Sequence, residues 1–231
     1  MVKNNIQSKK EKILDFIYPQ VCGICGKLDR NWLCPKCRMV IEEHKQIGID
    51  LPKESHGEFQ EFISLFSYEG IIRDLLIQYK FQEKPYLAKT LGNFLISQEP
   101  IKEKIQAYDI LMPVPISHKR KKERGYNQSL LLAKEIQVST KQVINTQSLV
   151  KIQNITEQSK LTKEERKQNI QGVYQLKHES MIKEKSVLII DDIYTTGSTI
   201  KECCKTIAKG KPSKIGILVM AKDELKEEEN N

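Results

Sequence analysis

The sequence contains no long hydrophobic run. Its apolar stretches, such as residues 187–190, fall far short of the ~20 residues that a membrane-spanning helix requires. No apolar segment typical of a signal peptide follows Met1. We therefore expect a cytoplasmic protein without membrane insertion.

Cysteine and histidine are scarce, and the cysteines are unevenly placed. Four of the 6 Cys form two CxxC pairs, whereas the 4 His are scattered without ligand spacing. Paired cysteines in a reducing compartment indicate a metal site and not a disulfide framework. Four thiolates complete the tetrahedral shell of Zn²⁺ and leave no position for water, so we expect a structural zinc site, with an iron–sulfur or redox site as the alternative. The expected ligands are Cys22, Cys25, Cys34 and Cys37.

Acidic residues are fewer than basic ones, with 30 Asp and Glu against 38 Lys and Arg and a formal net charge of +8. This excess favours anionic partners, whether polyphosphate ligands, nucleic acid or acidic lipid surfaces, and does not choose among them. With 231 residues, of which 39% are hydrophobic, the chain can build one core of ordinary size and a small appendage.

Periodicity and composition divide the chain into four parts. We expect an N-terminal helix and the zinc module at 1–50, a linker at 51–61, an α/β domain at 62–222 and a disordered acidic tail at 223–231. The α/β class rests on the C-terminal part, where an apolar strand, helically spaced apolar residues and a second apolar run follow one another. This order predicts a parallel sheet flanked by helices.

The most informative segment is VLIIDDIYTTGST at 187–199, where an apolar strand ends in Asp191 and Asp192 and a hydroxyl-rich turn leads into a helix. Backbone amides at such a helix start hold a phosphate, assisted by the helix dipole. Gly197 permits close approach, and the two carboxylates offer acceptors for the paired hydroxyls of a ribose. An acidic strand end before a capped helix, without a ligand, is the alternative. The expected phosphate-binding residues are Thr195, Thr196, Gly197, Ser198 and Thr199.

This segment closely resembles the phosphoribosyl pyrophosphate signature of the type I phosphoribosyltransferases. The resemblance implies a type I phosphoribosyltransferase-like fold for 62–222, with Mg²⁺ bound together with phosphoribosyl pyrophosphate. It also implies that Asp191 and Asp192 fix the sugar as catalytic residues. Some proteins with this signature bind the ligand without turnover, so the motif specifies the fold more closely than the activity.

A basic segment, PVPISHKRKKERGYNQ at 113–128, lies between an expected strand exit and a helix start. We expect it to be a loop whose positive charge attracts a diphosphate, with a solvated cationic loop as the alternative. Lys80, at the end of a helix that begins at Gly70, is interpreted as an exposed helix-end lysine in preference to a site residue.

Together with the polar stretch TEQSKLTKEERKQNIQGVY at 156–174 and the cysteine pairs, the basic segment resembles the ComF family. This family contains competence-associated phosphoribosyltransferase-like proteins, including GntX-like ones, and the resemblance spans nearly the whole chain. Tyr126 stands where the family often has Phe, and Glu157 replaces a frequent Pro, which affects the expected closure of the long loop. The resemblance implies diphosphate- or acceptor-side roles for Lys119, Arg120, Arg124, Asn127 and Gln128, and weaker assignments for Thr156, Gln158 and Arg166.

Two functions are compatible with these features. The first is binding of phosphoribosyl pyrophosphate with Mg²⁺ and transfer of the phosphoribosyl group to an acceptor that the sequence does not specify. The second, implied by the ComF resemblance, is non-catalytic binding of single-stranded DNA, with DNA-uptake or recombination proteins as partners. The two functions can coexist. Added salt should steeply weaken binding to a DNA backbone, which distinguishes it from binding of phosphoribosyl pyrophosphate.

Overall fold

The computed structural model describes residues 21–29, 33–49, 58–81, 84–152 and 172–223. The chain divides into two compact units, Met1–Glu43 and His44–Asn231. The expected N-terminal helix and most of the polar stretch at 156–174, including Thr156, Glu157, Gln158 and Arg166, lie outside the described residues. Within the described part of the chain, no helix has the length and apolar character needed to cross a membrane.

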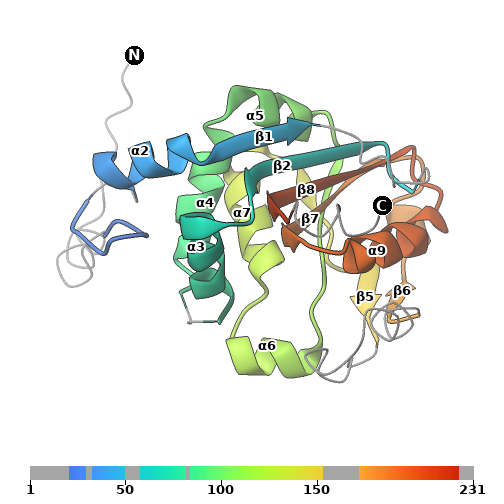
Figure 1. Cartoon of the computed structure of the whole chain (residues 1–231). Helices are drawn as coiled ribbons and strands as arrows, with labels where there is room; N and C mark the ends of the chain where they lie inside the picture. Colours follow the sequence, from blue (N-terminus) through green and yellow to red (C-terminus); the bar gives the residue numbers. More distant parts are fainter. Residues whose placement is uncertain (1–20, 30–32, 50–57, 82–83, 153–171, 224–231) are drawn as a thin grey trace, which may run out of the picture. The chain divides into compact units, whose positions relative to one another are not determined.

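The described residues of the first unit form a cysteine-bearing turn and helix α2 (Pro35–Glu43) (Figure 1). Val21 and Leu28 form an antiparallel bridge, and the turn between them is closed by a hydrogen bond from Cys22 N to Lys27 O at 2.7 Å. Helix α2 begins with a proline, which has no backbone N–H to leave unsatisfied in the first turn.

The second unit is built on a six-stranded mixed sheet with the order β1-β2-β8-β7-β3-β4. Strand β1 (Lys45–Ile49) pairs antiparallel with β2 (Glu61–Ser67). The other pairs are parallel and join β2 to β8 (Lys214–Lys222), β8 to β7 (Ser186–Tyr194), β7 to β3 (Ile110–Pro113) and β3 to β4 (Val143–Ile144). Strands β5 (Leu149–Lys151) and β6 (Tyr174–Leu176) form a separate antiparallel ribbon.

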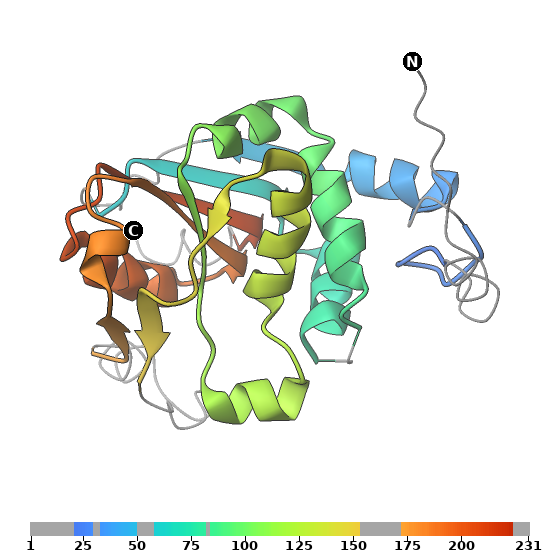
Figure 2. The ribbon, with the colours of Figure 1, turned by 180° about the vertical axis from the view of Figure 1, so that it is seen from behind.

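Helices cover both faces of this sheet (Figures 1 and 2). Helix α9 (Ser198–Ala208) lies on one side, and α4 (Leu87–Ile96) and α7 (Gln128–Thr140) lie on the other. The remaining helical segments of the described residues are α3 (Gly70–Phe81), α5 (Glu99–Gln106), α6 (His118–Arg124) and the short 3-10 segment η2 (Glu179–Met181).

The central strand β7 is buried on both faces, which explains its continuous apolar run. Because side chains alternate along a strand, Val187 and Ile189 pack in one cluster with Ile200, Cys203 and Ile207 of α9. All five are no more than 2% exposed. This packing fixes the start of α9 directly beyond the end of β7.

The structure corrects three sequence-based expectations. The sheet is not purely parallel, because β1 adds an antiparallel edge strand from residues expected to belong to the module at 1–50. Strand β7 does not end at the two aspartates but continues to Tyr194. The basic segment is not a loop, since it contains helix α6, with Ser117 Oγ accepting a hydrogen bond from Arg120 N and Gly125 ending the helix at φ 77°.

Candidate functional site

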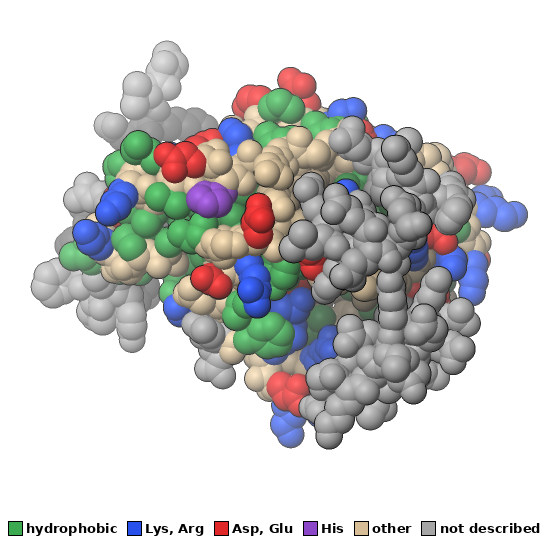
Figure 3. Space-filling view, in the orientation of Figure 1, with side chains coloured by type: hydrophobic (Ala, Val, Ile, Leu, Met, Phe, Trp, Pro, Cys, Tyr) green, Lys and Arg blue, Asp and Glu red, His purple; other side chains and the backbone are tan. Residues whose placement is uncertain are grey.

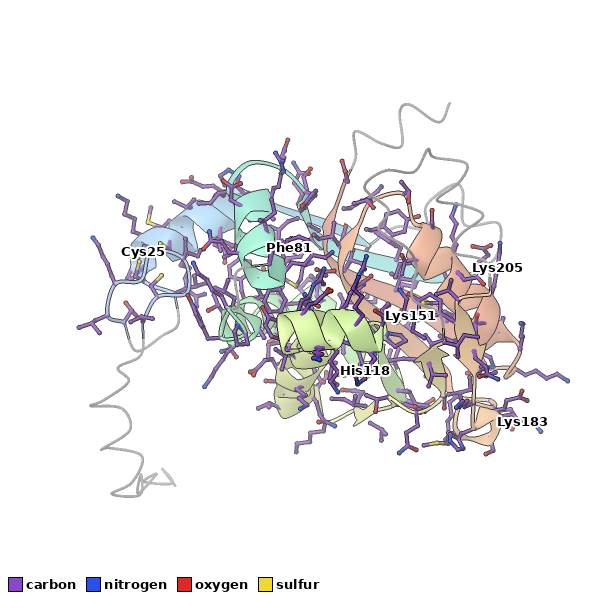
Figure 4. The ribbon with its side chains drawn as sticks, turned by 90° about the horizontal axis from the view of Figure 1, so that it is seen from below. Cys25, Phe81, His118, Lys151, Lys183 and Lys205 are labelled. Atoms are coloured by element: carbon purple, nitrogen blue, oxygen red, sulfur yellow. The ribbon has the colours of Figure 1, made fainter. Side chains whose placement is uncertain are left out.

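A cleft of about 340 Å³ lies where β3 and β7 end and α9 begins. The open end of a parallel sheet is the usual position of ligands in α/β folds. Helices α3, α6 and α7 and the β5–β6 ribbon supply the rest of its wall. Viewed from below, α6 crosses this end of the unit, with the labelled Phe81 of α3 and Lys151 of β5 near its two ends (Figure 4).

Asp191 and Asp192 lie side by side at one wall of the cleft. Asp191 Oδ1 accepts hydrogen bonds from Ser129 Oγ and from Asp192 N, both at 2.9 Å. Asp192 Oδ1 accepts one from Ile193 N at 3.1 Å. Asp192 Oδ2 is buried and receives no hydrogen bond of good geometry from a described residue, although Lys80 Nζ lies 3.3 Å away. Among the described residues, Oδ2 of Asp192 is therefore stabilised by the charge of Lys80 and not by a hydrogen bond of good geometry.

Burial strongly affects the ionisation of Asp191. Burial and, to a lesser extent, the neighbouring charge of Asp192 together raise the pKa of Asp191 to about 7, against the lowering effect of Lys80. Two carboxylates in one buried site do not readily ionise together, because each charge disfavours the other. A ligand that brings hydroxyl donors or a cation to the pair would favour the ionised form.

The interpretation of Lys80 as an exposed helix-end lysine is wrong. Its side chain is only 26% exposed, it lines the cleft and it pairs with Asp192. The end of α3 that carries Lys80 is fastened to the start of α7: Gln128 Nε2 donates to Lys80 O at 3.2 Å, and Tyr126 Oη donates to Tyr79 O. This anchoring fixes the position of the ammonium group.

The same contacts show what Asn127 and Gln128 do within the fold. Asn127 is the N-cap of α7, since its Oδ1 accepts from Leu130 N at 3.3 Å and its Nδ2 donates to Val114 O at 3.0 Å. Gln128 is 2% exposed and touches the cleft wall. Both residues position the walls of the cleft, and a direct role toward a ligand stays a prediction.

The expected phosphate-binding turn lies at the start of α9. Residues 195–199 all line the cleft, and the hydroxyl oxygens of Thr196 and Ser198 lie 2.9 Å apart. Gly197 has φ 69°, and a Cβ atom there would lie 2.2 Å from the hydroxyl oxygen of Tyr194. Only glycine fits at this position, because the turn is left-handed and lies directly on the tyrosine. The N-terminus of α9 therefore opens toward the cleft.

Helix α6 divides the basic residues into two groups. Arg120 and Arg124, one turn apart, are half-buried and line the cleft. Lys119 points elsewhere, is 64% exposed and lies 3.8 Å from Glu123, while Lys121 and Lys122 are exposed. Figure 3 shows Lys and Arg side chains gathered between the lower end of α3 and α6. Burial lowers the pKa of Arg124, and the nearby charge of Arg120 lowers it further.

Lys151 is a cleft residue that the sequence analysis missed. It stands opposite Tyr174 in the β5–β6 ribbon, with Nζ 5.3 Å from the centre of the tyrosine ring. Burial lowers the pKa of Lys151 to about 8, and Arg120 contributes in the same direction. Only its position five residues before the polar stretch at 156–174 could have singled it out, because β5 is too short to give a periodic signal.

In the first unit, the four expected zinc ligands come together. The sulfur atoms of Cys22, Cys25, Cys34 and Cys37 all lie within 4.8 Å of one another, and those of Cys25 and Cys34 are 3.7 Å apart. A tetrahedral zinc site with Zn–S bonds of about 2.3 Å requires sulfur–sulfur distances of roughly 3.8 Å. The cluster therefore has the dimensions and ligand set of a closed zinc site.

Comparison with known proteins agrees with this architecture. The sequence model of the phosphoribosyl transferase domain matches residues 131–231. Among solved structures, glutamine phosphoribosylpyrophosphate amidotransferase from B. subtilis aligns with a TM-score of 0.43 and 13% identity over 62% of this chain and 30% of its own. Hypoxanthine phosphoribosyltransferase from Staphylococcus aureus aligns with a TM-score of 0.38 and 19% identity, covering 62% of this chain and 66% of its own. The second unit thus contains a match to the phosphoribosyl transferase domain, and the first unit contains the four-cysteine cluster.

Several relatives align with a larger part of the chain. DNA utilization protein YhgH of Escherichia coli (strain K12) is 25% identical over 82% of this chain and 84% of its own length. Competence protein F of Haemophilus influenzae is 26% identical over 83% and 74%, and competence protein ComFC of Bacillus subtilis is 27% identical over 66% and 60%. The resemblance to the ComF family is confirmed by these relatives.

Proposed function

We propose that the cleft binds phosphoribosyl pyrophosphate together with Mg²⁺ and that the protein transfers the phosphoribosyl group to an acceptor. The observation that carries this proposal is the grouping of three complementary parts around one cleft. These are the turn at 195–199, the carboxylates of Asp191 and Asp192, and the cations Arg120, Arg124 and Lys151. Among the described residues, none of these three cations forms an ion pair with a carboxylate.

Each part suits one portion of the ligand. The backbone amides and hydroxyls of residues 195–199 suit the 5-phosphate, because a helix N-terminus is a ready anion site. Asp191 and Asp192 suit the two ribose hydroxyls as acceptors. Arg120, Arg124 and Lys151 suit the diphosphate, because its negative charge would compensate theirs at a site where water is partly excluded.

The residues present also fit Mg²⁺. This ion prefers oxygen ligands, and proteins hold it with one or two carboxylates plus substrate phosphates and water. Both aspartates already accept hydrogen bonds within the fold, which suits such a shared arrangement better than a cage built by the protein alone. When bound to the diphosphate, Mg²⁺ would neutralise part of the charge of the leaving group.

In the proposed reaction, the bond between C1 of the ribose and the diphosphate oxygen breaks, and its electron pair leaves with the diphosphate. An acceptor atom forms the new bond to C1 and loses its proton. Positive charge grows on the ribose and negative charge on the diphosphate. Asp191 and Asp192 would stabilise the first, and Arg120, Arg124 and Lys151 the second.

Calorimetric titration of the purified protein with phosphoribosyl pyrophosphate and Mg²⁺ tests this proposal. We expect saturable binding by the wild type and loss of binding in the Asp191→Asn, Asp192→Asn double variant. Arg120→Gln should weaken the binding of phosphoribosyl pyrophosphate by about tenfold, since loss of a charge-assisted hydrogen bond costs about 1.5–3 kcal/mol. It should weaken the binding of ribose 5-phosphate, which has no diphosphate, much less. A folded wild type that binds neither ligand would refute the proposal.

For the first unit, we propose that the four clustered thiols hold one structural Zn²⁺. The ligand set is all cysteine and closed, so no position remains for a water or a substrate. The metal would therefore stabilise this unit and take no part in the transfer reaction.

Binding of single-stranded DNA is a second candidate function. It is supported by the exposed lysines of α6, which do not line the cleft, by the net charge of +8, and by the names of the relatives, which refer to DNA utilization and competence. A strand that follows these lysines would be held through its phosphates, without base specificity.

A further inference from the structure

Phe81 occupies an unusual place for a large apolar side chain. It is the last residue of α3, it lines the cleft, and it is 64% exposed. A single exposed hydrophobic residue has little meaning on its own. Here, however, the ring stands at the mouth of a cleft whose other parts suit phosphates and hydroxyls.

A cation lies over this ring. The guanidinium carbon of Arg124 is 4.9 Å from the centre of the Phe81 ring, within the range of a cation–π contact. Arg124 is half-buried and makes no ion pair with a described residue. Even with this contact, more than half of the Phe81 surface remains exposed, so the ring has surface available for another planar group.

The neighbouring wall is apolar as well. Val114, Pro115 and Ile116, which follow β3, line the same cleft, and so does Tyr68 beyond the end of β2. Phosphates and ribose hydroxyls gain nothing from such surfaces, whereas a flat heteroaromatic ring gains both apolar contact and stacking on an aromatic or guanidinium plane.

We propose that Phe81 and Arg124 form a stacking platform for a planar heteroaromatic ring, the base of the acceptor in the transfer reaction. This inference rests on the proposed function, because the platform needs a phosphoribosyl group bound beside it. A nucleoside 5′-monophosphate would then fill both subsites at once, with its phosphate at 195–199 and its base on Phe81.

The test compares ribose 5-phosphate with AMP, GMP, CMP and UMP by calorimetry in the presence of Mg²⁺. We expect at least one nucleotide to bind the wild type more tightly than ribose 5-phosphate by about fivefold to a hundredfold, the range found for base–aromatic stacking. The Phe81→Leu variant keeps an apolar side chain and removes the ring, so it should lose most of this preference while its affinity for ribose 5-phosphate stays the same. Tyr86→Leu is the matched control, since Tyr86 is an exposed aromatic residue, 42% exposed, outside the cleft lining.

The outcomes separate the two proposals. If ribose 5-phosphate binds but no nucleotide binds more tightly, or if Phe81→Leu keeps the preference, the platform is refuted while the phosphoribosyl site stands. If folded wild-type protein binds neither ribose 5-phosphate nor phosphoribosyl pyrophosphate, the proposed function fails and the platform fails with it. Weaker binding of a thymidine oligonucleotide by Phe81→Leu, without any nucleotide preference in the wild type, would assign the ring to a DNA strand and refute an acceptor site.

Discussion

The adjacent carboxylates of Asp191 and Asp192 impose a cost on the fold that their surroundings only partly offset. Ser129 and backbone amides donate to them, and Lys80 supplies one positive charge for two carboxylates. Because two buried carboxylates share one positive charge, further hydrogen-bond donors or a bound cation would stabilise them. The protein without ligand is therefore less stable because of this carboxylate pair, and the proposed ligand would bind at the same place and stabilise it.

This cost makes a prediction about pH. Burial raises the pKa of Asp191 to about 7, whereas an aspartate in the unfolded chain titrates at about 3.9. Between these values the folded protein holds a proton that the unfolded chain has lost, so stability falls as pH rises through this window. Asp191→Asn removes the ionisation and keeps an oxygen that accepts from Ser129. In thermal unfolding without ligand, we expect the variant to have the higher Tm at pH 8 and the two proteins to converge near pH 4.

Asp109 provides a control of opposite sign. Hydrogen bonds from the backbone and side chain of Ser186 lower the pKa of Asp109, so its ionised form stabilises the fold above the unfolded pKa and loses this effect in acid. Asp109→Asn should therefore lower Tm at pH 8, and this effect should shrink as pH falls below about 3.9, the pKa of an aspartate in the unfolded chain. A difference between Asp191→Asn and wild type that does not grow with pH would contradict the argument.

At the scale of elements, the strand ends opposite the cleft are tied together by one carboxylate. Glu61, the first residue of β2, accepts from Tyr108 Oη at 2.7 Å and lies 2.9 Å from Lys214 Nζ and 2.8 Å from Lys104 Nζ. Its side chain is only 10% exposed. Burial alone would raise the pKa of Glu61, but the hydrogen bonds from Lys104, Tyr108 and Lys214 lower it to about 2. This carboxylate links β2 to β8, α5 and the approach to β3.

We expect Glu61→Gln to reduce the free energy of unfolding by about 2–3 kcal/mol at pH 7, since hydrogen bonds to a charged group are lost and cations remain without their partner. Because the folded pKa lies below the unfolded one, the difference should shrink as pH falls from about 4.5 toward 2. Urea unfolding at several pH values measures it. Glu99→Gln is the matched control: Glu99 is 68% exposed and pairs with Lys102, so its loss should cost no more than about 0.5 kcal/mol.

Helix α6 separates the two candidate functions. Replacing Lys119, Lys121 and Lys122 with Gln should leave phosphoribosyl pyrophosphate binding unchanged, because none of the three lines the cleft. If these lysines contact a single strand, the same variant should bind it more weakly, and the slope of log affinity against log salt should become shallower by about 2. Arg120→Gln, on the same helix but in the cleft, should show the reverse pattern. An unchanged salt slope in the triple variant would remove α6 from any strand-binding surface.

The elements with long apolar patterns were predictable from the sequence. Strand β7, helix α9 and strand β8 follow the expected order, because each has enough apolar residues to show its period. Strand β1 and the β5–β6 ribbon were missed, since short strands carry little periodic signal and their pairing depends on distant residues. Helix α6 was missed because its like charges suggested a loop, whereas the Ser117 and Gly125 caps stabilise a helix.

The site shows the same division. The motif at 187–199 identified the acid pair and the phosphate turn, because it is continuous in sequence and lies on one strand, turn and helix. Lys80 and Lys151 reach the cleft from elements far away in the sequence, and only tertiary packing brings them there. Residues that reach a site only through tertiary packing, such as Lys80 and Lys151, carry no local sequence pattern from which their role could be predicted.

At the scale of the whole molecule, the cysteine cluster and the cleft belong to different compact units. The four thiols lie within Met1–Glu43, and every residue that lines the cleft comes from His44–Asn231. A unit as small as the first has little core of its own, so a metal would supply most of its stability. The second unit has a complete sheet and apolar clusters on its strands and helices.

We therefore expect the loss of zinc to affect the first unit and to spare the cleft. Cys25→Ser should lower the zinc content of the purified protein from one per chain to nearly none and should increase amide hydrogen exchange at 21–43. The affinity for phosphoribosyl pyrophosphate should change by less than about twofold. Cys204→Ala is the matched control, because Cys204 is a buried residue of α9 in the second unit and is not one of the four clustered thiols, so its loss should lower stability while zinc stays bound. If a folded Cys25→Ser protein lost ligand affinity by tenfold or more, the two units would have to be coupled, and the zinc would take part in shaping the phosphoribosyl site.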